Sequence, residues 1–308
     1  MISCYLCEKT EFVQCIPVRD YISGELFEVG TCASCRLVST LGLPEASELS
    51  KYYGQAYYGN RKSFFDYIIN KTRVKRILRL KKSGTLLDVG CGKGDFLLAL
   101  HAHGWQVFGT EFSTLYDYSV LEKMIQTKIC IADIAQCNFP EKNFDIVTLW
   151  HVFEHLTEPR RYLSHIAQLL HPHGYLIIEV PNFDSWQAHF GGNDCFHVDA
   201  PRHTMHLTPE TLTKFLTQAG FIVVGISHVS FFYDVFGTIQ TILNKFTKRK
   251  NLLFDVLGNR VRWQDNVIDT IVTIILSPFL FIFALILYPL AVFAQKGGII
   301  TLYAGLPR

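Results

Sequence analysis

Short apolar runs of strand length alternate with segments of helical spacing through the middle of the chain. Strands that alternate with helices in this way form a parallel sheet with helices on both faces. The pattern therefore predicts an α/β fold with a doubly wound, Rossmann-like sheet. The apolar runs, each long enough for one buried strand, fall at 86–89, 105–110, 129–132, 144–149, 174–182 and 221–226.

Composition changes this picture in one place. The 308 residues carry a net charge of +2, which gives no general reason to expect nucleic acid as a partner. However, 49% of the residues are hydrophobic, which is high for a soluble enzyme and needs a local cause. Residues 1–30 lack the pattern of a signal peptide, and the nine cysteines are odd in number, so we expect a reducing cytosol.

The excess of apolar residues comes from 270–294, a segment without a charged side chain. We interpret it as a membrane segment rather than a buried core helix, because core helices are shorter and keep a polar stripe. Upstream, apolar residues at helical spacing precede a group of cations, as in an interfacial helix at an anionic membrane. The apolar set is Phe236, Ile239, Ile242, Leu243 and Phe246, and the cations are Lys245, Lys248, Arg249 and Lys250.

A second basic segment, predicted to be a helix over 63–82, is either a solvated face or another site for anionic lipid.

A glycine-rich turn follows the first predicted strand. Asp88 precedes Gly90, Gly92 and Gly94, which permit a sharp turn and a close approach of a ligand to the backbone. The dinucleotide fingerprint G-x-G-x-x-G would need glycine at position 95, where the chain has Asp95. Ligands of doubly wound folds lie beyond the carboxyl ends of the strands. The residues that follow the other strands there are Glu111, Asp133, Trp150 and Asn182.

This G-x-G-x-G turn with its upstream acid resembles motif I of the class I S-adenosylmethionine (SAM) methyltransferases. The resemblance implies that SAM lies across 88–94 and that Asp133 meets the adenine, while an acid at the place of Glu111 usually binds the ribose. It also implies a seventh, antiparallel strand beside the sixth, for which 298–305 is the candidate. A domain that binds another nucleotide is the alternative. The predicted cofactor-binding residues are Asp88, Gly90, Gly92, Gly94, Glu111, Asp133 and Trp150.

Two cysteine pairs stand near the amino terminus, Cys4 with Cys7 and Cys32 with Cys35. Four thiolates close a tetrahedral site, so the spacing predicts a structural zinc ion in a zinc ribbon rather than a redox dithiol. An amino-terminal zinc domain followed by a tyrosine-rich segment, here 52–58, resembles sugar and secondary-metabolite methyltransferases. The remaining cysteines are predicted to be ordinary buried residues: Cys15, Cys91, Cys130, Cys137 and Cys195.

The loop after the fifth strand is rich in chemistry, and its segment 197–203 resembles the H-x-D-x-P-R-H motif of a broad methyltransferase group common in glycan and lipid biosynthesis. Histidine is the natural general base at neutral pH, so His197 and His203 are the catalytic candidates. We expect Asp199 to fix a tautomer, and Arg202 and Asn182 to contact the substrate. The alternative is a hydrogen-bond network of the loop itself, in which Arg202 packs against Asp199.

One further group raises the question of a metal, because His151, Glu154 and His155 share one helical turn. Positioning of the cofactor or of the following helix is the role we favour for them. Beyond this loop, Thr208 and Pro209 are predicted to begin a helix that stops at Gly220.

The seventh strand restricts how the apolar segment can meet a membrane. If 298–305 joins a cytosolic sheet, the chain must leave and re-enter the membrane on one side, whereas about 25 helical residues cross a bilayer only once. We therefore expect a re-entrant or interfacial hairpin bent near Pro278 or Pro289. A single-pass anchor is the alternative.

These features predict a SAM-dependent methyltransferase at the cytoplasmic face of a membrane, with a sugar or head group of a lipid-linked glycan as acceptor and no nucleic acid partner. The alternatives are a polyprenyl quinone O-methyltransferase and, in another class, an inactive SAM-binding scaffold that recruits partners through its zinc ribbon. The predicted parts are a zinc ribbon at 1–45, an aromatic linker and basic helix at 46–82, a methyltransferase core at 83–229 with 297–308, and a membrane-associated insertion at 230–296.

Overall fold

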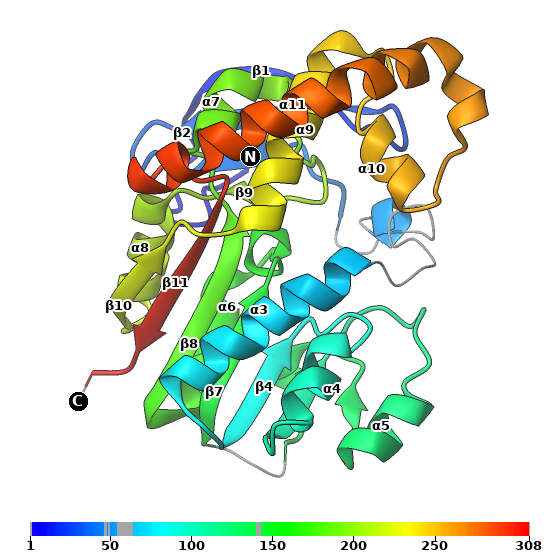
Figure 1. Ribbon diagram of the computed structural model, residues 1–308. Helices are drawn as coiled ribbons and strands as arrows, with labels where there is room; N and C mark the ends of the chain where they lie inside the picture. Colours follow the sequence, from blue (N-terminus) through cyan, green and yellow to red (C-terminus); the bar gives the residue numbers. More distant parts are fainter. Residues whose placement is uncertain (1, 46–47, 49, 54–63, 140–142, 308) are drawn as a thin grey trace.

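The computed structural model describes the chain except residues 1, 46–47, 49, 54–63, 140–142 and 308. A sheet of seven strands in the order β10–β11–β8–β7–β4–β5–β6 forms its centre (Figure 1). The predicted Rossmann-like fold is confirmed, because β11 alone runs antiparallel to its neighbours and lies beside the sixth strand of the sheet, β10. The strands are β4 (Thr85–Val89), β5 (Gln106–Thr110), β6 (Ile129–Cys130), β7 (Phe144–Trp150), β8 (Leu170–Pro181), β10 (Ile222–Ser227) and β11 (Ile299–Gly305).

Helices cover both faces of this sheet, and each face has its own buried cluster. On one face, α3 (Phe64–Leu80) and α4 (Asp95–His101) contribute Ile77 and Leu97, with α5 (Ser119–Ile125) beside them. On the other face, α6 (Pro159–Leu169) and α8 (Pro209–Gln218) contribute Leu163 and Leu212. The predicted start of α8 is confirmed, since the Thr208 hydroxyl accepts a hydrogen bond from the backbone N–H of Thr211 at 3.1 Å.

A second, small sheet joins the amino-terminal residues to the loop after β8. Its order is β1 (Phe12–Arg19), β2 (Leu26–Cys32), β3 (Val38–Leu41) and β9 (Met205–His206). The strand β9 comes from the loop that carries the H-x-D-x-P-R-H motif, and Val38 of β3 pairs with its His206. Cys4 and Leu6 belong to the same buried cluster as the large sheet. The ribbon is therefore packed into the core and shares a strand with it.

The insertion between β10 and β11 consists of α9 (Phe231–Phe246), α10 (Leu252–Leu257) and α11 (Val267–Phe293). The prediction of a hairpin bent near Pro278 or Pro289 is wrong, because α11 continues through both prolines as one helix. The chain reverses earlier, between α9 and α11, which pack against each other (Figure 1). Helix α9 begins after β10, and α11 ends before β11, which pairs with β10. The chain therefore returns to the sheet without a reversal inside the apolar segment.

The apolar row of α9 faces the protein and not an outer surface. Ile239 and Leu243 are buried in one cluster with Ala284 of α11, whereas Phe246 is exposed. Three of the cations there pair with nearby acids, such as Lys250 with Asp194 at 2.6 Å. The expectation that α9 itself lies at the membrane is therefore wrong, and its apolar face supports α11 instead.

Two predictions for the cysteines differ from the structure. Cys130 and Cys137 form a disulfide, and Cys15 is exposed, whereas Cys91 and Cys195 are buried as expected. Within the predicted tyrosine-rich segment, residues 54–58 lie outside the described residues. The shorter helices of the loops are η1 (Ser50–Tyr53), η2 (Ile134–Gln136), η3 (Phe153–His155), α7 (Trp186–Gly191), η4 (Gly192–Asp194) and η5 (Trp263–Asn266).

Candidate active site

The glycine turn after β4 lies against the end of β5, since the backbone N–H groups of Gly90 and Cys91 both donate to the carbonyl of Thr110 at 2.9 Å. Gly90, Gly92 and Gly94 all have positive φ, which favours glycine. A β-carbon at Gly90 would come within 2.5 Å of Val152, but one at Gly92 would meet open space. The turn thus leaves its backbone accessible at Gly92, as a closely approaching ligand requires.

Two carboxylates border this open space from the neighbouring strands. Glu111, directly after β5, accepts a hydrogen bond from the backbone N–H of Gly92 at 2.8 Å. Asp133, after β6, accepts from Ala135 N at 2.8 Å and from the Tyr162 hydroxyl at 3.0 Å. Both carboxylates are half-buried, so each retains lone pairs for a ligand. The structure brings both predicted acids to the carboxyl edge of the sheet.

Asp88 has a different place, beneath the turn. It is buried and accepts a hydrogen bond from the Thr148 hydroxyl at 2.6 Å. Burial raises the pKa of Asp88 to about 7, because the charged form loses its hydration. Its contacts organise the strand ends of β4 and β7 under the glycine turn.

Trp150 closes the same edge at the end of β7. It packs edge-on against Phe96, with ring centroids 5.6 Å apart, and the Arg73 guanidinium lies 4.8 Å from its ring. Arg73 and Arg76 of α3 also pair with the buried carboxylate of Glu179. Although burial alone would raise it, the pKa of Glu179 is about 2 because these two cations favour the charged form.

This ion cluster was not foreseen from the sequence. Glu179 lies inside an apolar strand pattern, and the sequence around Arg73 and Arg76 predicts only a basic helix. The signal was the charged residue itself, because a carboxylate inside a buried strand needs a partner.

A small cavity lies next to η3 and the H-x-D-x-P-R-H loop. Both histidines predicted as general bases line it, together with Glu154 and Asn182. The Nδ1–H of His203 donates to the backbone carbonyl of His197 at 2.9 Å. The Nε2 atom of His197 is buried and has no hydrogen-bond partner within the described residues.

Burial and nearby histidines weaken both rings as bases. The pKa of His197 falls to about 3 because of its burial and because His151 lies near, and burial lowers the pKa of His203 well below its usual value. Both rings are therefore neutral at physiological pH. Their low proton affinity is unfavourable for general-base catalysis, which works best with a pKa near the working pH.

Two predicted roles in this loop are wrong. Arg202 does not face a substrate, because its side chain is fully buried and donates to Asp20 at 2.6 Å and to Asp199 at 3.0 Å. Asp199 therefore binds Arg202 and does not orient a histidine; the alternative of an internal loop network is what the structure contains. The histidine tautomer is fixed by a backbone carbonyl instead.

Asn182 is also engaged within the protein. Its side-chain amide donates to the carbonyl of Gly297 at 2.8 Å, and its oxygen accepts from Asp184 N at 3.0 Å. These bonds tie the end of β8 to the start of β11. Asn182 also lines the small cavity, so the predicted contact with a substrate stays a prediction for that side of the residue.

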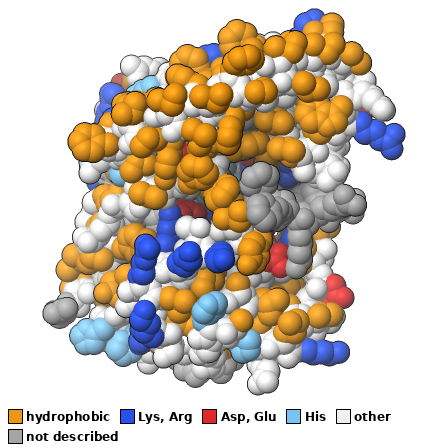
Figure 2. All heavy atoms as spheres, viewed as in Figure 1, with side chains coloured by type: hydrophobic (Ala, Val, Ile, Leu, Met, Phe, Trp, Pro, Cys, Tyr) orange, Lys and Arg blue, Asp and Glu red, His pale blue; other side chains and the backbone are white. Residues whose placement is uncertain are grey.

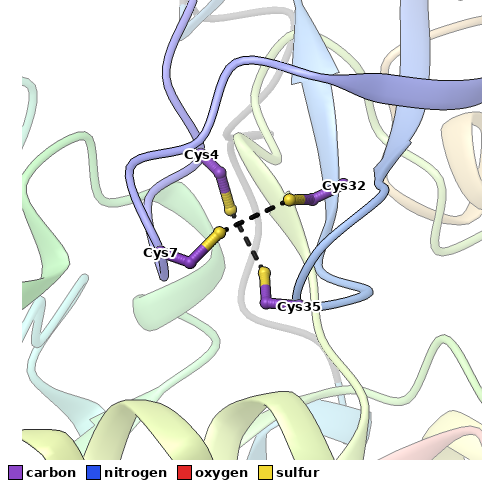
Figure 3. Close-up of side chains that lie close together, drawn as sticks. All are labelled: Cys4, Cys7, Cys32 and Cys35. Carbon is purple, nitrogen blue, oxygen red and sulfur yellow. Dashed lines mark hydrogen bonds between the residues drawn. The ribbon is translucent and has the colours of Figure 1, made fainter.

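The four amino-terminal cysteines converge on one point, as Figure 3 shows. The Sγ atoms of Cys4 and Cys35 are 3.4 Å apart, those of Cys7 and Cys32 are 3.5 Å apart, and all four lie within 4.8 Å of one another. In a tetrahedral zinc site with bonds of about 2.3 Å, the sulfur atoms are separated by about 3.8 Å. The cluster fits a structural zinc ion.

Residues 63–226 match the family model described as "Methyltransferase domain". The chain belongs to this family, and it carries a class I SAM-dependent methyltransferase domain. Among curated proteins, it is 26% identical over 141 residues to a probable S-adenosylmethionine-dependent methyltransferase of Mycobacterium tuberculosis, which covers 46% of this chain and 50% of the relative. The chain thus spans about half the length of this curated relative.

A ubiquinone biosynthesis O-methyltransferase of Coxiella burnetii is 27% identical over 177 residues, which covers 54% of this chain and 76% of the relative. Among solved structures, a Burkholderia thailandensis 1,6-didemethyltoxoflavin-N1-methyltransferase with bound S-adenosylhomocysteine overlaps with a TM-score of 0.48 at 17% identity, over 68% of this chain and 90% of that chain. The family assignment does not depend on this structural overlap.

Proposed function

We propose that this protein is an active SAM-dependent methyltransferase whose acceptor is the sugar or polar head of a lipid-linked glycan, methylated at a membrane surface. The observation that carries the membrane part is the reversed polarity of α11. The helix turns polar and small residues toward the protein and large apolar residues outward. A surface helix in water has the opposite arrangement.

The inner face of α11 includes the buried residues Asp269, Thr273, Ala284 and Ala291. Small residues on an inner face with apolar residues outside are typical of helices that pack in lipid. The segment Trp263–Phe293 is also long and apolar enough to cross a membrane, with only 11% of its most apolar window buried. The exposed outer residues include Ile268, Ile271, Ile274, Phe279, Ile282, Ile286 and Phe293.

The ends of α11 favour a helix that lies in the interface over one that spans. At its start, the Asp269 carboxylate accepts hydrogen bonds from the backbone N–H groups of Lys248 at 3.2 Å and Arg249 at 2.8 Å. At its end, Lys296 pairs with Asp184 at 2.6 Å, and β11 then enters the sheet. Because both ends are bound to the folded domain, the outer face can enter a bilayer without carrying the chain across it.

Charge supports the same orientation. Figure 2 shows the apolar band over α11 and, on the same face of the molecule, a row of Lys and Arg side chains across the region of α3. The exposed cations of that helix include Lys71, Lys75 and Arg79. A face with both an apolar band and cations suits an anionic lipid surface. We expect this lipid surface to be the cytoplasmic face of the membrane.

For the cofactor, we propose the residues at the carboxyl edge of the sheet. SAM, when bound, supplies an electrophilic methyl group. Glu111 would bind the ribose hydroxyls, Asp133 the adenine amino group, and the open backbone at Gly92 would allow the close approach. Trp150 would border the methyl-donating end of the site, next to the acceptor cavity with His197 and His203. The four cysteines of the ribbon would hold a structural zinc ion.

Flotation with vesicles tests the membrane proposal. The protein should float with vesicles that contain phosphatidylglycerol, and Ile274→Lys with Ile282→Lys should reduce the bound fraction about tenfold or more, because two charges would enter the apolar layer. Val120→Lys, on α5, is the matched control, since Val120 is 67% and Ile274 61% exposed. Equal flotation of the double variant and the control would contradict the proposal.

A second readout separates the membrane from the chemistry. In detergent solution, the double variant should bind SAM like the unchanged protein, because α11 does not border the cofactor edge. On a lipid-linked acceptor in vesicles, the turnover of the double variant should fall, because the enzyme is no longer concentrated at the surface that carries the acceptor. Methylation of a polyprenyl quinone instead of a lipid-linked glycan would replace the acceptor proposal with the quinone alternative.

A further inference from the structure

Glu154 carries a buried carboxylate close to three histidines. It lies in η3 with 1% of its surface exposed, and neither carboxylate oxygen has a hydrogen-bond partner among the described residues. The ring nitrogen Nδ1 of His151 lies 3.3 Å from Oε1. Because a buried carboxylate that lacks hydrogen bonds is costly, a cation bound at this position would be strongly stabilising.

Two histidine rings stand beside this carboxylate. His155 follows it in the chain, and His203 comes from the H-x-D-x-P-R-H loop, with 4.8 Å between the two ring centroids. The Nδ1 atom of His155 lies 2.9 Å from the carbonyl of Arg202, and that of His203 lies 2.9 Å from the carbonyl of His197. A carbonyl only accepts, so each Nδ1 carries the proton and each Nε2 carries a lone pair. Metal-bound histidines are oriented in this way by such carbonyls.

The three side chains are close enough to share one ion. One carboxylate oxygen of Glu154 and one ring nitrogen from each of His155 and His203 lie within 4.8 Å of one another. Around a tetrahedral ion with bonds of about 2.1 Å, such atoms are separated by about 3.4 Å. Side-chain movements of about 1 Å would therefore complete the site. His155 is only half-buried, which gives an ion a path to it.

We propose that Glu154, His155 and His203 bind a divalent transition-metal ion of the zinc type. Two imidazoles and one carboxylate are a donor set that suits zinc and leaves a fourth position open. Two of the three ligands, Glu154 and His203, line the small cavity, so an acceptor oxygen in that cavity could take the open position. The site deepens the proposed function, because the metal ion would bind the acceptor oxygen. It does not require a lipid-linked acceptor, and it makes His203 a metal ligand in place of a general base.

Metal content tests this site in the full-length protein. If the ribbon also holds zinc, purified protein should contain about two zinc ions per chain. Glu154→Gln and His203→Gln should each reduce this to about one, and Cys4→Ser should remove the other. His151→Gln is the matched control, because His151 lies just before η3 and next to Glu154 but outside the donor set, and it should keep both ions.

Cobalt spectroscopy distinguishes the two sites without depending on a variant that could misfold. Cobalt in the ribbon should give the thiolate charge-transfer band, whereas cobalt at Glu154 should add absorption without such a band. The proposal predicts that Glu154→Gln loses only the second signal while SAM affinity stays within about twofold. Cobalt uptake that ends with the thiolate band, or a metal content in Glu154→Gln equal to that of the unchanged protein, would overturn the metal site. Either result would leave the membrane proposal untouched.

Discussion

Arg202 Nη2 donates to Asp20 Oδ1 at 2.6 Å, and both side chains are fully buried although 182 positions separate them in the chain. The same guanidinium holds Asp199 at 3.0 Å. Nearby, the Thr40 hydroxyl donates to the carbonyl of His203 at 2.6 Å. The amino-terminal cysteine ribbon is therefore bound to the loop with the H-x-D-x-P-R-H motif through its β-hairpin and through β3, and we expect the conformation of one to depend on the other.

Removal of Arg202 should destabilise the protein strongly. Arg202→Met leaves two carboxylates without their shared partner and should lower the free energy of unfolding by about 3–5 kcal/mol. Asp20→Leu combined with Arg202→Met should recover part of this loss, which a double-mutant cycle in urea would measure. Lys128→Ala, which breaks the exposed pair with Glu122, serves as control and should cost less than about 1 kcal/mol. Equal effects for Arg202 and Lys128 would contradict a stabilising role for the buried pair.

Loss of ribbon zinc should disturb the loop with the H-x-D-x-P-R-H motif while the cofactor edge keeps its structure. Cys4→Ser or Cys35→Ser should release the ion, and amide exchange should increase over 197–206, because β3 and β9 then lose their anchor. SAM affinity should change less than about threefold, since Glu111 follows β5 and belongs neither to the ribbon nor to the loop at 197–206. Unchanged exchange over 197–206 in a zinc-free variant would show that ribbon and loop are independent.

The acid at Glu111 should control cofactor affinity. Glu111→Ala removes an ionised acceptor for the ribose and should weaken SAM binding by about 1.5–3 kcal/mol per lost hydrogen bond, which calorimetry would measure. Glu122→Ala is the matched control. Its carboxylate, on α5, pairs with Lys128 at 2.7 Å and accepts a hydrogen bond from the backbone N–H of Ile129 at 2.9 Å, whereas that of Glu111 accepts from Gly92 in the glycine turn. Equal SAM affinity for a folded Glu111→Ala and the control would refute the cofactor assignment.

The Glu179 cluster predicts a loss of stability in acid. The pKa of Glu179 is about 2 in the folded protein, against about 4.3 for an unperturbed glutamate, so the unfolded state binds the proton first. Its contribution, on the order of 3 kcal/mol, is present above about pH 4.3 and is lost as the pH falls toward 2. The difference in unfolding free energy between the unchanged protein and Glu179→Gln should therefore shrink from pH 5 to pH 3. A constant difference over this range would contradict the ion cluster.

The large sheet could be predicted because buried parallel strands are continuous apolar runs bounded by turns, as 144–149 shows. The glycine turn and Glu111 were likewise predictable, since they follow strands whose ends must meet at one edge. The pairing of Arg202 with Asp20 and that of Glu179 with Arg76 were not predictable, because these partners come from elements far away in the chain. Local pattern contains no information on such pairs.

The bend expected at Pro278 or Pro289 shows a different limit. Proline removes one backbone hydrogen bond and often kinks a helix, yet α11 continues through both. The reversal that the topology demanded was correctly expected, but the chain makes it between α9 and α11. The outward apolar face of α11 could not be read from a segment that is apolar all round; only the packing of Thr273 and Ala284 against the protein reveals it.

Transfer of label from SAM tests the central claim most directly. The purified protein would be incubated with native membranes and methyl-labelled SAM, with Glu111→Ala as the control for cofactor-dependent transfer. We predict that label enters the lipid extract and that mild acid releases it with a water-soluble sugar head, in an amount that falls at least tenfold in the control. Label found in protein, or no label above the Glu111→Ala control, would contradict a methyltransferase that acts on lipid-linked glycans.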